Sequence, residues 1–108
     1  MTNRIDALLD LLKSGRDSAV LRFGLGQALS TEGRHTEAIE HLNAALTQDN
    51  DYSAAWKLLG KTHLANEDWP AAQHAYEQGL RIAQANGDRQ SVNEMTVFLK
   101  RIAKKAGT

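Results

Sequence analysis

The 108-residue sequence predicts an all-α fold of short antiparallel helices, and three observations support this. Apolar residues recur at three- and four-residue spacing in every segment, from Ile5, Leu8 and Leu12 onward, as expected for amphipathic helices. Ala and Leu, which are strong helix formers, outnumber the β-branched residues. The one proline, Pro70, lies where a helix is expected to begin, so its missing N–H removes no helical hydrogen bond.

Capping residues and glycines predict where each helix begins and ends. Asp17 and Asp51 follow polar stretches and are predicted N-caps, and Asp68 is predicted to cap the helix that contains Pro70. Gly33 predicts one helix end, and Asn86-Gly87-Asp88 predicts a helix end followed by a new cap. The predicted helices span residues 3–13, 18–32, 35–48, 52–66, 69–85 and 88–105. Because the linkers are short, consecutive helices are expected to pack antiparallel.

Composition excludes several functional classes. The 13 basic and 13 acidic residues give no net charge, which argues against a nucleic-acid partner. The absence of cysteine excludes disulfides, thiolate metal sites and thiol nucleophiles. No apolar stretch is long enough to cross a membrane, and Asp6 and Asp10 interrupt the segment where a signal peptide would be apolar. We therefore expect a single cytoplasmic domain with no membrane association.

The chain contains an internal repeat with a period of 34 residues. A shift by this period places Leu25-Gly26 on Leu59-Gly60, and it also places Ala38 on Ala72. The second copy of the repeat is the more complete of the two. It contains, in order, Trp56, Leu59, Gly60, His63, Ala72 and Tyr76.

This period and pattern resemble the tetratricopeptide repeat (TPR), a pair of antiparallel helices. The resemblance implies a helix-hairpin solenoid in which residues 19–52 and 53–86 are two full repeats. Residues 1–18 resemble the second half of a truncated repeat, because Ile39, Leu42 and Leu46 fall on Ile5, Leu8 and Leu12 after a shift of 34. Residues 87–108 resemble the first half of a third repeat after a shift of 36. These two flanking segments are expected to act as capping helices.

The repeat pattern also predicts how the helices pack. Gly26 and Gly60 are expected to let the two helices of each repeat approach closely, with Ala38 and Ala72 facing them. Trp69 is expected to pack between repeats. A bulky side chain at Gly60 should therefore destabilise the fold through overpacking.

No arrangement of residues points to catalysis, a metal or a cofactor. The four histidines form no His-Glu-x-x-His pattern. Glu37 with His41, and His63 with Glu67, could each share a helix face, but two ligands do not make a zinc site. Gly24 and Gly26 lie within a predicted helix and form no phosphate-binding loop. The sequence therefore predicts a protein that is not an enzyme.

The resemblance implies that the first helix of each repeat lines a concave groove. By position, the candidate groove residues are Phe23, Gln27, Thr31, Lys57, Lys61, Leu64, Asn93, Lys100 and Arg101. Four of these are cationic and none is a carboxylate, so we expect a peptide or protein segment with acidic groups as the ligand. The predicted function is that of a non-catalytic protein-protein interaction module.

Two alternatives remain open on the sequence. The lysines could form a solvated stripe without a ligand, and the chain could instead be a homodimeric scaffold that associates through Leu9 or Phe98. One class of TPR proteins binds chaperone tails through a Lys–Asn carboxylate clamp. The corresponding positions here hold Phe23, Gln27, Leu58, Gln90 and Glu94, none of which matches, so that mode is not expected.

Overall fold

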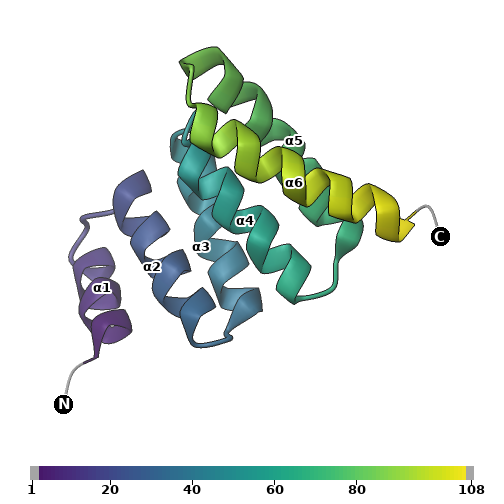
Figure 1. Cartoon of the computed structure of the whole chain (residues 1–108). Coiled ribbons are helices and arrows are strands. Elements are labelled where there is room, and N and C mark those ends of the chain that lie inside the picture. The colour runs from purple at the N-terminus through teal and green to yellow at the C-terminus, as the bar shows by residue number, and fades with distance from the viewer. Residues whose placement is uncertain (1–2, 107–108) are drawn as a thin grey trace. The chain divides into compact units, whose positions relative to one another are not determined.

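A computed structural model describes residues 3–106, and these residues form six α-helices with no strand among them (Figure 1). The helices are α1 (Arg4–Lys13), α2 (Ala19–Thr31), α3 (His35–Gln48), α4 (Ser53–Ala65), α5 (Trp69–Asn86) and α6 (Arg89–Ala106). Each boundary lies within one residue of the sequence prediction, so the predicted all-α class and helix order are confirmed. None of the helices that the structure describes is long and apolar enough to span a membrane.

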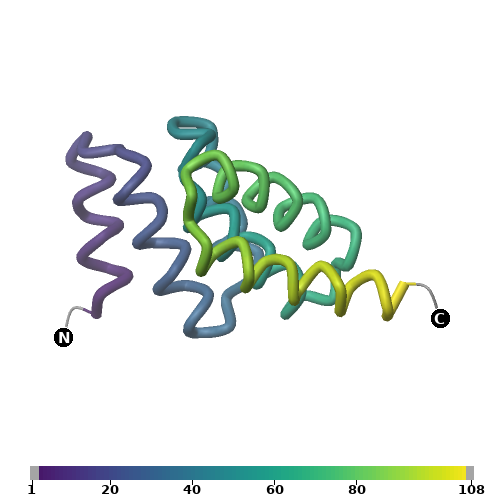
Figure 2. The backbone as a smooth tube through the Cα atoms, turned by 45° about the horizontal axis from the view of Figure 1, so that its top comes forward, coloured from purple at the N-terminus to yellow at the C-terminus, as the bar shows by residue number. Residues whose placement is uncertain are grey.

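The helices form two compact units, Met1–Asn50 and Asp51–Thr108. In the first unit α2 packs against both α1 and α3, and in the second unit α5 packs against both α4 and α6. Helices that are consecutive within a unit run in opposite directions (Figure 2). Each unit therefore consists of a complete helical hairpin with one further helix packed against it.

Some predicted caps form and others do not. Asp68 accepts a hydrogen bond from the Ala71 N–H, and Asp88 accepts one from the Ser91 N–H, as predicted. Gly33 and Gly87 follow helices with φ of 76° and 70°, a conformation that glycine adopts without steric penalty.

The predicted caps Asp17 and Asp51 are wrong by one residue. The N-cap of α2 is Ser18, whose hydroxyl accepts from the Leu21 N–H, and the N-cap of α4 is Tyr52, whose side chain makes no capping bond.

Asp17, which precedes α2, instead forms hydrogen bonds with side chains of α2 and α3. Its two carboxylate oxygens each accept one bond from Arg22, at 2.9 Å, and Gln48 at the end of α3 donates to the same carboxylate at 2.8 Å. Arg22 and then Gln48 are the main reasons that the pKa of Asp17 falls to about 2. The carboxylate is thus held by side chains of α2 and α3 and caps no backbone N–H of α2.

Each unit has its own hydrophobic core. In the first unit Ile5 from α1 packs with Leu25, Ala28 and Leu29 of α2 and with Ala38 of α3. In the second unit Ala72, Tyr76 and Ala83 of α5 form a buried cluster with Met95 and Ile102 of α6. The Tyr76 ring also stacks on Phe98, with 5.1 Å between the ring centroids.

Three glycines mark the closest helix contacts. A Cβ atom on Gly60 would lie 2.8 Å from the Tyr76 ring, and one on Gly26 would lie 2.6 Å from the Leu42 side chain. A Cβ atom on Gly79 would lie 2.7 Å from the Met95 sulfur. The expected close approaches at Gly26 and Gly60 are therefore present, with the Tyr76 ring against Gly60.

Gly60→Ala should lower the free energy of unfolding by about 1–2 kcal/mol, because overpacking against the buried Tyr76 ring outweighs the gain in helix propensity. Gly24→Ala is the matched control, because a Cβ there would lie 3.8 Å from Leu8, an ordinary contact. That control should raise the free energy of unfolding by up to about 1 kcal/mol. Urea denaturation measures both, and equal effects of the two changes would contradict the close crossing.

The Asp17 carboxyl should titrate at about 2 in an NMR pH titration, and Arg22→Gln should raise that pKa toward the usual 3.8. Because the folded-state pKa is lowered, the stabilisation is present above about pH 3.8 and is lost as the pH falls toward 2. An unchanged Asp17 pKa in Arg22→Gln would show that the guanidinium is not its main partner.

Candidate functional site

The candidate residues Lys57, Lys61 and Leu64 lie along one side of α4, separated by one helical turn each. Lys57 Nζ lies 3.1 Å from Glu94 Oε2 of α6 and forms an ion pair with it. The expectation that the cationic groove contains no carboxylate is therefore wrong. Alignment of α6 with α4 places Asn93 at the Lys57 position, but the packing of α6 turns the next residue, Glu94, toward α4.

Glu94 is held from two sides. One carboxylate oxygen accepts from Lys57 and the other accepts from Gln90 Nε2, both at 3.1 Å. Lys57 foremost, and then Gln90, lower the pKa of Glu94 below its usual range. Both side chains of the ion pair remain about a third exposed, so water weakens the pair. Lys57 is therefore a partly neutralised cation.

The second helix continues this surface beyond Glu94. Because α4 and α6 both run antiparallel to α5, they run in the same direction (Figure 1). Val97 and Arg101 follow Glu94 on α6 by about one and two helical turns. Lys61 and Leu64 follow Lys57 on α4 by the same intervals, so the two sets of side chains continue in the same direction from the Lys57–Glu94 ion pair. We call this surface the α4–α6 face. It consists of Lys57, Lys61, Leu64, Glu94, Val97 and Arg101.

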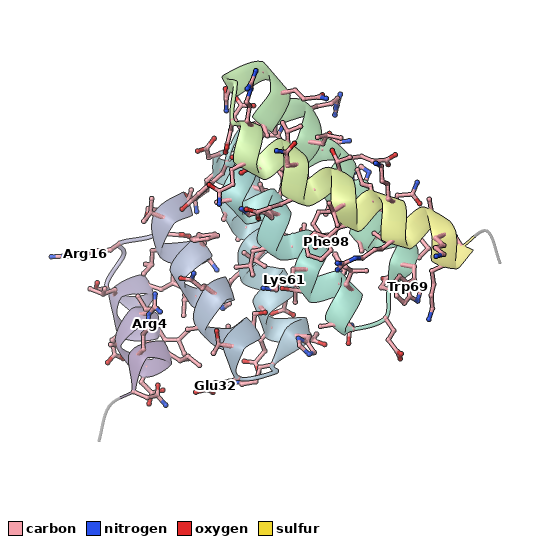
Figure 3. The ribbon with its side chains drawn as sticks, viewed as in Figure 1. Arg4, Arg16, Glu32, Lys61, Trp69 and Phe98 are labelled. Carbon is pink, nitrogen blue, oxygen red and sulfur yellow. The ribbon has the colours of Figure 1, made fainter. Side chains whose placement is uncertain are left out.

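Two cations of the α4–α6 face have no ion pair. Within residues 3–106 no carboxylate lies within 4.0 Å of the Lys61 ammonium or the Arg101 guanidinium, and both side chains are exposed. The Arg101 guanidinium lies 5.4 Å from the centre of the Phe98 ring, and Figure 3 shows Lys61 and Phe98 on the neighbouring helices α4 and α6. A guanidinium over a ring keeps its N–H donors directed outward in its own plane, available to a carboxylate.

Asn93 and Lys100 lie on the flank of Val97 that is opposite to Glu94 and Arg101, four residues before Val97 and three after it. Asn93 lines a surface depression with Ala83, Gln84 and Val92, and Lys100 follows it by two helical turns. Trp69 is half-buried against the core of the second unit, and Lys105 Nζ lies 5.4 Å from the centre of its ring. The indole therefore packs within its own unit, against α6.

The remaining candidates, Phe23, Gln27 and Thr31, belong to α2 in the first unit. Phe23 and Gln27 line a depression of about 450 Å³ between α1 and α2. Thr31 lines another depression with Arg4, Ile5, Ala28 and Glu32. The sequence analysis did not predict the α1–α2 depression. Apolar residues such as Leu11 and Val20, which are exposed near the start of the repeat array, could have indicated it.

The histidines are used in packing and hydrogen bonding. His41 Nδ1 lies 3.1 Å from Arg22 Nη1, and burial, followed by the Arg22 charge, lowers the pKa of this imidazole. His63 is half-buried, and burial lowers its pKa as well. Glu37, a candidate partner of His41, forms two hydrogen bonds with Arg34 instead. Over residues 3–106 no three His, Asp or Glu side chains are grouped to hold a metal ion.

Leu9 and Phe98, the residues of the homodimer alternative, pack within their own units. Both are only partly exposed and lie against the core clusters. The large apolar side chains that are exposed on the described surface are Leu11, Val20 and Val97.

In an NMR titration Glu94 should have a pKa below 4.5, and Lys57→Gln should raise it. Because the pKa is lowered in the folded state, the pair stabilises the fold above about pH 4.5 and loses this effect as the pH falls. Lys61→Gln is the control and should leave the Glu94 pKa unchanged. A Glu94 that responds equally to both changes would refute a specific Lys57 contact.

Two known proteins are similar to this chain in sequence. The chain is 47% identical over 98 residues to TPR repeat-containing protein PA0015 of Pseudomonas aeruginosa, covering 91% of this chain and 93% of that protein. It is 33% identical over 79 residues to the heat-shock protein cognate co-chaperone sgt12 of Aspergillus fumigatus, covering 73% of this chain but only 23% of that protein.

Two solved structures have the same fold. The solution structure of protein BPP2914 from Bordetella parapertussis has a TM-score of 0.85 and 42% identity, and the match covers 97% of this chain and 91% of that one. The Sgt2 TPR domain from Aspergillus fumigatus has a TM-score of 0.82 and 27% identity, and the match covers 95% and 68%.

A family model described as tetratricopeptide repeat matches residues 29–92, which is more than half of the chain. The resemblance found in the sequence is thereby confirmed. This match and the high identity to a TPR repeat-containing protein show that the chain belongs to the tetratricopeptide repeat family, whose fold generally serves protein–protein interaction without catalysis.

Proposed function

We propose that the chain binds an acidic, extended segment of a partner protein along the α4–α6 face. The observation that carries this proposal is the pair of exposed cations, Lys61 and Arg101, which have no carboxylate partner within the described residues. Cations on a face that its own chain does not neutralise favour ligands with carboxylates and increase the rate of encounter with them.

Apolar groups accompany these charges. Val97 is 47% exposed between the Glu94 and Arg101 turns of α6, and Leu64 is half-buried on α4. An acidic segment with an aliphatic side chain could bury that side chain against Val97 while its carboxylates bind Lys61 and Arg101. Apolar burial then contributes affinity, and the charges determine register.

Lys57 has a different role from the other cations. A ligand carboxylate that approaches it must compete with Glu94, which already holds its ammonium at 3.1 Å. Lys61 is therefore the primary contact on α4, and Lys57 contributes to the rigidity of the face. Asn93 and Lys100 border the α4–α6 face beside Val97, and Lys100 adds a further cation there.

The named co-chaperone relative does not extend this proposal to chaperone tails. The positions that match the carboxylate clamp hold Phe23, Gln27, Leu58, Gln90 and Glu94. Glu94 would repel a terminal carboxylate at the clamp position, and it is paired with Lys57. The proposed ligand is therefore an internal acidic segment rather than a free carboxy-terminus.

Selection from a random dodecapeptide display library tests this proposal. Wild-type protein should enrich peptides that combine Asp or Glu with an aliphatic residue, because only these satisfy Lys61, Arg101 and Val97 together. Lys61→Glu should weaken binding of a selected peptide by roughly tenfold or more at low salt.

Lys13→Glu is the matched control, because it makes the same change of charge on exposed α1 and should leave binding unchanged. Enrichment of peptides without acidic residues, or equal losses in the two variants, would overturn the proposal. Circular dichroism confirms that both variants keep their helical content.

A further inference from the structure

We infer that the depression between α1 and α2 is the binding seat for one amphipathic α-helix of a partner protein, and that the first turn of this helix is acidic. The depression measures about 450 Å³, and its apolar surface comes from Leu8, Leu11, Val20, Phe23 and Gly24. This site lies in the first unit and does not depend on the proposed function of the α4–α6 face.

The second unit of the same chain shows what an equivalent surface binds. By the repeat register, α1 corresponds to α5, 68 residues later, and α2 corresponds to α6, 70 residues later. The α5 and α6 helices are contacted by α4, whereas in the first unit no helix among the described residues occupies the corresponding place on α1 and α2.

The residues that receive α4 correspond to residues that line the depression. Gly60 of α4 lies against Tyr76, Trp56 lies against Gly79, and Lys57 binds Glu94. In the repeat register Tyr76, Gly79 and Glu94 correspond to Leu8, Leu11 and Gly24, all of which line the depression. The depression therefore has the position of a helix seat that no described helix of the first unit fills.

The solvent exposure of apolar side chains in the depression supports the binding of a partner helix there. Val20 is 71% exposed and Leu11 is 40% exposed, and these are two of the large hydrophobic side chains that the described surface leaves open. Burial of such side chains against an apolar helix face removes apolar surface from water and is favourable. Gly24 adds room for close approach, because a Cβ there would meet only Leu8, at 3.8 Å.

The direction and charge of the bound helix follow from the correspondence of α1 and α2 with α5 and α6. The first half of α4 meets Gly79 and Glu94, and its middle meets Tyr76, so an equivalent helix would begin near Leu11 and end toward Arg4. Arg4 then lies at the negative end of the helix dipole, where a cation is favourable.

Arg16, which lines the depression near its other end, would repel the positive start of the helix unless the first turn carries carboxylates. Figure 3 shows Arg16 extending from the linker that follows α1. None of the described residues that line this depression is acidic, although Asp10 lines a neighbouring one with Arg16, so the complementary carboxylates are expected from the partner.

A second copy of the chain is a poor occupant. In a second copy, the helix that could take the place of α4 is α6, which also corresponds to the first helix of a repeat. The last turns of α6 carry Lys100, Arg101, Lys104 and Lys105, and binding would bring these cations toward Arg4. Arg4 also stands where the second unit has the small Ala72, so the close crossing that Ala permits is absent here. An acidic helix from a different protein satisfies both constraints.

Fluorescence anisotropy with a designed peptide tests the inference. The probe is a labelled helix of about 16 residues with Ala and Leu along one face, Glu in its first turn, and Gln elsewhere. We expect saturable binding to the full chain, roughly tenfold tighter at low salt than that of the same peptide with Lys replacing Glu. Arg16→Glu should reverse this preference.

Leu11→Glu should abolish binding, whereas Ala103→Glu, which adds the same charge at an exposed position of α6 outside both proposed surfaces, should leave it unchanged. Absence of saturable binding, equal affinity for the Glu and Lys peptides, or equal losses in the two variants would overturn the inference. Sedimentation that shows a dimer dissolved by Leu11→Glu would assign the seat to a second copy and would also overturn it. Lys61→Glu, which tests the α4–α6 face, should not affect this peptide.

Discussion

The close approach of helices at glycine is the constraint on which the rest of this structure depends. Gly60 places the α4 backbone against the Tyr76 ring, and Gly79 lets Met95 of α6 and Trp56 of α4 approach α5. Because each contact leaves no space for a Cβ atom, the crossing of the helices is defined within a narrow range. These contacts therefore determine where the exposed sides of α4 and α6 lie relative to each other.

The neutral composition conceals an uneven distribution of charge. Several charged side chains are paired within the fold, as in Asp17 with Arg22, Arg34 with Glu37, and Lys57 with Glu94. The α4–α6 face differs from these paired regions because its Lys61 and Arg101 side chains have no carboxylate within 4.0 Å among the described residues. In a chain of zero net charge, recognition of an acidic ligand therefore depends on local pairing rather than on the total.

The two proposed binding surfaces use different parts of the repeat design. The α4–α6 face uses the exposed sides of two helices whose packing is complete, and it suits an extended acidic segment. Among the described residues of the first unit, no helix lies in the place that α4 occupies on α5 and α6. The α1–α2 depression is open for this reason, and it suits a partner helix. One family fold thus offers both modes, and the side chains determine which ligand each accepts.

The sequence by itself determined the six helices and the close crossings at Gly26 and Gly60, because apolar spacing, capping residues and the 34-residue period are local or repeating signals. It did not place Glu94 beside Lys57 or Gln48 beside Asp17, since these contacts depend on the rotation of one helix relative to another. Only the tertiary structure decided which charges are paired and which apolar residues stay open, because both outcomes depend on which helix sides face each other, which the spacing within one helix leaves undefined.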